Sequence, residues 1–142
     1  MRHSTRSGAC LHGRHSGSGD SAVTCAQADP FLAPESLQCE AARYAGDTDL
    51  RHPLLSPLLG DLRGHPSLLV QVGTDEILLD DSRRLKEHAE EAGVEVTLRI
   101  WEGMWHVWQR FVPGVPEAHE ALKEIGDFVR SPVAGGASGR GA

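Results

Sequence analysis

Two short apolar runs separated by an amphipathic stretch form the strongest pattern in this chain of 142 residues. Residues 67–72 are almost continuously apolar and are followed by a glycine, as in a strand buried on both faces of a parallel sheet. Residues 94–101 are rich in β-branched side chains and alternate, which indicates a second strand. Residues 80–92 repeat apolar side chains at helical spacing. This order of strand, helix and strand predicts a right-handed parallel crossover, and therefore an α/β fold.

Two further segments have helical patterns. One begins at Pro34 and ends near Gly46. The other, over residues 117–130, places its apolar side chains on one stripe, which is typical of a helix that covers a sheet. Residues 47–66 contain three prolines, each of which disfavours helix at the preceding residue, so we expect a loop there.

The two ends of the chain show no such periodicity. Residues 1–28 are rich in Gly, Ser, Arg and His, and we expect them to be a disordered N-terminal segment. Residues 131–142 are rich in Gly, Ala and Ser, which is typical of a flexible tail. This leaves residues 29–130 as one partial α/β domain.

Composition excludes several classes of partner. The net charge of -6 argues against a nucleic-acid surface, which would need a clustered basic face. The apolar runs are too short to cross a membrane, and the N-terminus lacks the apolar stretch of a signal peptide. Three irregularly spaced cysteines suit reduced thiols better than a disulfide framework. We therefore expect a cytoplasmic protein with no cofactor and no metal.

Candidate chemistry follows the two predicted strands. Asp75 and Glu76 come after the first strand and His106 after the second, so neighbouring carboxyl ends of parallel strands would bring an acid and a base together. In a Ser-His-acid triad the imidazole takes the serine proton, and the acid fixes the tautomer and stabilises the imidazolium. The plain alternative is a loop histidine and two solvated turn residues. Asp80 and Asp81 have a structural explanation, because carboxylates in the first turn of a helix interact favourably with its dipole, by about 0.3–1 kcal/mol.

Five short motifs occur in a fixed order. They are Asp29-Pro30-Phe31-Leu32, Ser56-Pro57-Leu58, Leu69-Val70-Gln71-Val72-Gly73, Glu76-Ile77-Leu78-Leu79-Asp80-Asp81 and Gly103-Met104-Trp105-His106. In this order they resemble the C-terminal part of the hormone-sensitive-lipase-like α/β-hydrolases (alpha/beta hydrolase fold-3), above all the bacterial esterases of that family. The resemblance covers about residues 29–130. It implies an eight-stranded α/β-hydrolase sheet of which this chain holds the last two strands, with small carboxylic esters as substrates and a helical cap over the acyl pocket.

The resemblance also implies roles for the site residues. Matching Leu78-Leu79-Asp80 to the Leu-x-Asp of the family's acid motif puts Glu76 in the position of the triad acid. Asp75, one residue earlier, is the alternative acid. His106 corresponds to the triad histidine.

One short segment of this chain resembles the motif that carries the nucleophilic serine in this family. Gly19-Asp20-Ser21-Ala22 resembles the start of the family's Gly-Asp-Ser-Ala-Gly nucleophile elbow. The elbow is a strained strand-to-helix turn that needs glycine at its last position, where this chain has Val23. No apolar strand precedes Ser21, no helical pattern follows it, and the interval from Ser21 to Glu76 is too short for the intervening elements of the fold. We therefore do not expect Ser21 to be the nucleophile.

Two hypotheses follow for the function. The first is a truncated carboxylic-ester hydrolase that carries the acid and histidine of the triad without the serine, and is inactive as an isolated chain. The second is a non-catalytic α/β interaction module in which both residues are relics. An unpaired strand edge also predicts marginal stability, and either self-association or pairing with a complementing N-terminal fragment.

Overall fold

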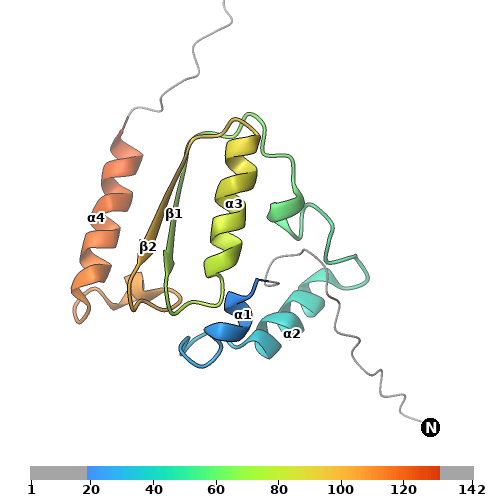
Figure 1. Ribbon diagram of the computed structural model, residues 1–142, viewed down its shortest axis with the longest axis horizontal. Helices are drawn as coiled ribbons and strands as arrows, with labels where there is room; N and C mark the ends of the chain where they lie inside the picture. The colour runs from blue at the N-terminus through green and yellow to red at the C-terminus, as the bar shows by residue number, and fades with distance from the viewer. Residues whose placement is uncertain (1–18, 132–142) are drawn as a thin grey trace, which may run out of the picture.

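A computed structural model describes residues 19–131. In it a two-stranded parallel sheet has one long helix on each side, α3 (Leu79–Glu91) on one and α4 (Pro116–Arg130) on the other (Figure 1). In chain order the elements are α1 (Ser21–Thr24), α2 (Pro34–Ala45), η1 (Pro57–Leu59), β1 (Leu68–Gly73), α3 (Leu79–Glu91), β2 (Val96–Trp101), η2 (Trp108–Phe111) and α4 (Pro116–Arg130). The predicted crossover of strand, helix and strand is confirmed as β1, α3 and β2. None of the helices within residues 19–131 is long and apolar enough to cross a bilayer.

The sheet presents a different chemistry to each flanking helix. β1 and β2 pair from Leu68 opposite Val96 to Gly73 opposite Trp101. Alternate side chains of a strand point to opposite faces, so Leu68 packs with the α3 side around Ala89. On the other face Gln71 donates to the carbonyl oxygen of Ala121 in α4, at 3.1 Å.

Helix α4 covers the sheet over only part of its apolar stripe. Ala118 and Ala121 are fully buried, and they form a cluster with Met104 and Trp108. Further along the same stripe Val129 is 75% exposed. The predicted packing of α4 on the sheet is therefore found only in the first half of the helix. Within residues 19–131 the two strands are too small a surface to bury its second half.

Residues 19–28 were expected to be disordered, but in the structure they are folded against the rest of the chain. Ser21 at the start of α1 is buried, and its hydroxyl donates to the carbonyl oxygen of Ile77 at 2.8 Å and accepts from the Asp80 N–H at 3.0 Å. The Asp80 carboxylate in turn accepts the Ser21 N–H at 2.8 Å. These contacts join polar groups 56 to 59 positions apart, so they leave no periodicity in the sequence that could indicate them. The expectations for residues 1–18 and 132–142 lie outside the described residues.

Gly73 is the point where the end of β1 meets the loop that follows β2. A Cβ atom at Gly73 would lie 1.8 Å from the carbonyl oxygen of Met104, far inside van der Waals contact. The same carbonyl accepts the Asp75 N–H at 3.0 Å, and the Thr74 N–H donates to the carbonyl oxygen of Trp101 at 2.9 Å. The two loops therefore close on each other only because residue 73 has no side chain.

We expect Gly73→Ala to lower the free energy of unfolding by about 1–3 kcal/mol, the usual cost of inserting an atom where backbone must shift to admit it. Urea titration of both proteins would measure this loss. Gly114→Ala is the matched control, because a Cβ atom at Gly114 meets nothing within 4 Å. A Gly73→Ala protein as stable as the Gly114→Ala protein would contradict the argument.

Candidate active site

The acid of the site lies in the turn that joins β1 to α3. Glu76 is buried, with 5% of its surface exposed. Its Oε2 accepts the N–H of Gly73 at 3.2 Å, and its Oε1 lies 2.7 Å from Nδ1 of His106. Both carboxylate oxygens therefore have partners, and the side chain is fixed by the end of the strand that precedes it.

His106 lies in the loop after β2, and the residues around it hold that loop in place. Gly103 has a positive φ of 66°, and its N–H donates to Oγ1 of Thr74 at 2.8 Å. Val107 follows His106 with a φ of 57°, a left-handed conformation that is strained for a β-branched residue and persists only where the surroundings enforce it. Met104 and Trp108 are buried on either side. The imidazole thus projects from a loop that is fixed at both ends.

The contact between Glu76 and His106 decides which ring nitrogen can act. A carboxylate only accepts hydrogen bonds, so Nδ1 of His106 carries the proton and donates it to Glu76, which leaves Nε2 of the neutral ring with a free lone pair. The hydrogen bond to Glu76 raises the pKa of His106 above its usual value, burial opposes this, and the charges of Glu76 and Asp29 raise it further. The side chain of His106 is still 29% exposed, so the ring remains accessible.

Asp75, the alternative acid, points elsewhere. Its Oδ1 accepts from the hydroxyl of Thr74 at 3.3 Å, and its N–H is bound to the carbonyl oxygen of Met104. No hydrogen bond joins Asp75 to His106 in the described part of the chain. Of the two acidic candidates, the structure brings only Glu76 to the histidine.

Ser21 makes its contacts with the start of α3 instead of with the histidine. Its hydroxyl is engaged by Ile77 and Asp80. Across residues 19–131 no serine hydrogen-bonds to His106. The serine therefore has a structural use, and it offers no nucleophile to the imidazole in this arrangement.

Asp29 is a neighbour of the pair that sequence reasoning used only as part of a motif. It is buried, with 7% of its surface exposed. Its Oδ1 accepts the N–H groups of Phe31 and Leu32, both at 3.0 Å, and its Oδ2 accepts the N–H of Ile77 at 3.4 Å. The Asp-Pro dipeptide could have indicated the first two bonds, because Asp side chains often bind backbone groups two residues on. The bond to Ile77 spans 48 positions and has no local signal.

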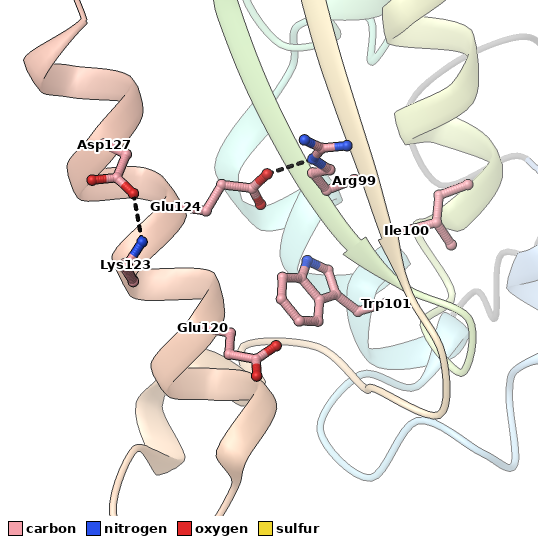
Figure 2. A pocket seen from close by; sticks show the side chains of 7 residues that line it. All are labelled: Arg99, Ile100, Trp101, Glu120, Lys123, Glu124 and Asp127. Atoms are coloured by element: carbon pink, nitrogen blue, oxygen red, sulfur yellow. Dashed lines mark hydrogen bonds and ion pairs between the residues drawn. The ribbon is translucent and has the colours of Figure 1, made fainter.

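A hollow of about 520 Å³ between β2 and α4 is a separate feature (Figure 2). It is lined by Arg99, Ile100, Trp101, Glu120, Lys123, Glu124 and Asp127. Arg99 forms an ion pair with Glu124 across it. Neither Glu76 nor His106 lines the hollow. Within residues 19–131 no group of three or more His, Cys, Asp or Glu side chains is placed to hold a metal ion.

Known proteins resemble this chain over most of its length. Residues 10–110 match a family described as alpha/beta hydrolase fold. An acetyl-hydrolase of Streptomyces hygroscopicus is 42% identical over 118 residues, which are 83% of this chain and 40% of that protein. An esterase of Acinetobacter venetianus is 46% identical over 105 residues, which are 72% of this chain and 34% of that protein. This chain thus spans between a third and two fifths of the length of these relatives.

The same likeness holds for solved structures. A crystal structure of an esterase from the bacterial hormone-sensitive lipase (HSL) family superimposes with a TM-score of 0.79 and 46% identity, over 82% of this chain and 39% of that one. A hormone-sensitive lipase from a metagenome library gives a TM-score of 0.77 and 39% identity, over 80% of this chain and 39% of that one. At these identities and TM-scores, this chain shares both sequence and fold with the matched parts of the two proteins.

The raised pKa of His106 predicts how stability depends on pH. Because the pKa of His106 is higher in the folded than in the unfolded chain, protonated His106 stabilises the fold. This contribution is complete below about pH 6.5, the ordinary pKa of histidine, and is lost as the pH rises through the folded-state pKa. We expect Glu76→Gln to lower the pKa of His106, because an amide cannot supply the charge. The difference in unfolding free energy between the two proteins should therefore be larger at pH 6 than at pH 9. Urea titrations at both pH values, with NMR titration of the imidazole, would check this, and an unchanged His106 pKa in the variant would refute it.

Proposed function

This chain belongs to the alpha/beta hydrolase fold family, and we propose that Glu76 and His106 are the acid and base of a Ser-His-acid triad in a carboxylic-ester hydrolase. The observation that carries the proposal is the 2.7 Å contact between Oε1 of Glu76 and Nδ1 of His106. It lies at the carboxyl ends of two parallel strands, which is where α/β sheets place their sites. The names of the relatives, an esterase and an acetyl-hydrolase, support the reaction class.

The geometry suits both halves of ester hydrolysis. Nε2 of His106 takes the proton of a serine hydroxyl as its oxygen attacks the ester carbonyl, and then gives that proton to the leaving alcohol. In the second half Nε2 takes a proton from water, which attacks the acyl-serine, and returns it to the serine oxygen. Through both halves Glu76 holds the proton on Nδ1 and stabilises the imidazolium. Its burial strengthens this interaction, because few waters screen it.

The serine itself is proposed to come from outside residues 19–131. Ser21 is engaged with Ile77 and Asp80, which supports this assignment. β1 has one edge that is unpaired in the described part of the chain, and a strand of the segment that carries the serine would pair there. A second copy of the chain could occupy the same edge.

The proposed substrates are small carboxylic esters, and the proposed location is the cytoplasm. The substrate class rests on the relatives alone. The location rests on the thiols, since Cys25 and Cys39 form no disulfide within residues 19–131, as is usual for cysteines in a reducing compartment.

A non-catalytic role is the second candidate. The engagement of Ser21 favours it, because the described residues then offer the imidazole no nucleophile. In that case Glu76 and His106 would only fasten the turn after β1 to the loop after β2.

We expect a polypeptide of these 142 residues to hydrolyse short p-nitrophenyl esters no faster than its His106→Ala variant. In a triad enzyme, loss of the nucleophile costs about 10⁶ in turnover, so residual rates would be at background. Steady-state assays of both proteins at several concentrations would test this. Turnover that disappears in Ser21→Ala would show that Ser21 is the nucleophile after all.

A complete enzyme would test the acid. The segment of this chain that matches the Acinetobacter venetianus esterase, 105 residues at 46% identity, can replace its counterpart in that enzyme. In this chimera we expect Glu76→Ala to lower turnover by about 10⁴, as loss of the triad acid does elsewhere. Asp75→Ala is the matched control and should cost far less, because within residues 19–131 its carboxylate accepts from Thr74 and forms no hydrogen bond with His106. A larger loss in Asp75→Ala would make Asp75 the acid, and equal activity in all three proteins would favour the non-catalytic role.

A further inference from the structure

Asp29 is a buried carboxylate that the proposed mechanism does not use. It lies in the segment between α1 and α2, and its hydrogen bonds within the described part of the chain come from the backbone N–H groups of Phe31, Leu32 and Ile77. A buried carboxylate is costly unless such donors compensate for the lost water. The bonds to Phe31 and Leu32 stabilise the turn in which Asp29 itself lies, whereas the bond to Ile77 connects Asp29 to the turn after β1.

This bond acts on the residue next to the proposed acid. Ile77 is 1% exposed and follows Glu76 directly. Its N–H is bound by Asp29 and its carbonyl oxygen by Ser21, so the peptide groups on both sides of Ile77 are fixed by residues from the N-terminal segment. A displacement of Ile77 would therefore move Glu76 relative to His106.

The same segment also reaches the histidine loop. The ring of Phe31 packs on the ring of Phe111 with centroids 5.6 Å apart, and Phe111 packs on Trp105, next to His106, at 6.0 Å. Asp29 is thereby held close enough for its charge to raise the pKa of His106. Within residues 19–131 two charged groups act on that pKa: Glu76 from the turn after β1 and Asp29 from the segment before α2.

We propose that Asp29 is a positioning residue of this site: its carboxylate fixes the turn that carries Glu76 and supplies a second negative charge within electrostatic range of His106. The proposal rests on the proposed function, because positioning matters only if the pair is catalytic. The charge itself can be tested without any ester. A residue that merely closed its own turn would leave the proton affinity of His106 unchanged.

The test is an NMR titration of the His106 imidazole in the full chain. In Asp29→Asn, which keeps one oxygen for Phe31 and Leu32 but removes the charge, we expect the pKa of His106 to fall, because the charge of Asp29 is one of the causes that raise it. In Glu76→Gln it should fall further, because the direct hydrogen bond is the larger cause.

Two control variants separate charge from structure. Ser21→Ala removes two hydrogen bonds to the same turn but no charge, so we expect it to lower the melting temperature and to lower the His106 pKa less than Asp29→Asn does. Asp75→Asn removes a charge from the same turn at a side chain that is not among the causes of the raised His106 pKa, and should leave that pKa unchanged. An Asp29→Asn protein that titrates like the wild type, or a Ser21→Ala protein with the same fall in pKa, would overturn the proposal.

Failure to fold is also informative. If Asp29→Asn does not fold, the titration is repeated with Asp29→Ser, whose hydroxyl oxygen can still accept the N–H of Phe31. If neither variant folds, Asp29 is needed for the fold and not specifically for His106, and the proposal is wrong. In the chimeric enzyme, Asp29→Asn should move the lower limb of the pH profile of kcat/KM to lower pH. A chimera without esterase activity would refute the proposed function while the NMR result still decided the role of Asp29.

Discussion

The close approach of two backbones at Gly73 is the constraint on which the site depends. The carbonyl group of Met104 occupies the space where any other residue would place its Cβ atom. Because of this approach, the Asp75 N–H can reach that carbonyl and the hydroxyl of Thr74 can receive the N–H of Gly103. These bonds bring the acid turn and the histidine loop to a fixed separation. The hydrogen bond between Glu76 and His106 is then formed between two side chains whose backbones are already in place.

Buried carboxylates are the second principle of this region, and backbone N–H groups stabilise them. Glu76 accepts from Gly73, and Asp29 from Phe31, Leu32 and Ile77. The partly buried Asp80 accepts from Ser21 in the same way. Removing a carboxylate from water costs several kcal/mol, and a precise set of donors is needed to recover it. Each acid therefore fixes the backbone that supplies its donors. Through these bonds the segment 19–32 becomes part of the site, although it is distant in sequence from both proposed catalytic residues.

Periodicity predicted the elements of this fold well and its polar contacts poorly. The strands, the crossover helix α3 and the outer helices α2 and α4 all begin and end within two residues of the positions that apolar spacing and helix-ending residues indicate. Ser21 and Asp29 lie in a stretch without apolar repeats, so nothing local announces that their side chains bind Ile77. The same gap explains why α1 was not foreseen. The choice of Glu76 over Asp75 came from the register of a family motif, and it is Glu76 that contacts His106 in the structure.

The acid and the base are assembled by one crossover unit and the segment that braces it. Within residues 19–131, the hydrogen bonds that fix Glu76 and His106 come from β1, the turn after it, the loop after β2 and the N-terminal segment. None of them requires the nucleophilic serine, so the orientation of the imidazole is set before any nucleophile is supplied. If the proposed function holds, a serine brought to Nε2 meets a base whose tautomer and position are already determined. Such preorganisation is worth several kcal/mol of activation free energy, since the entropy of orienting the base has been lost during folding instead of during the reaction.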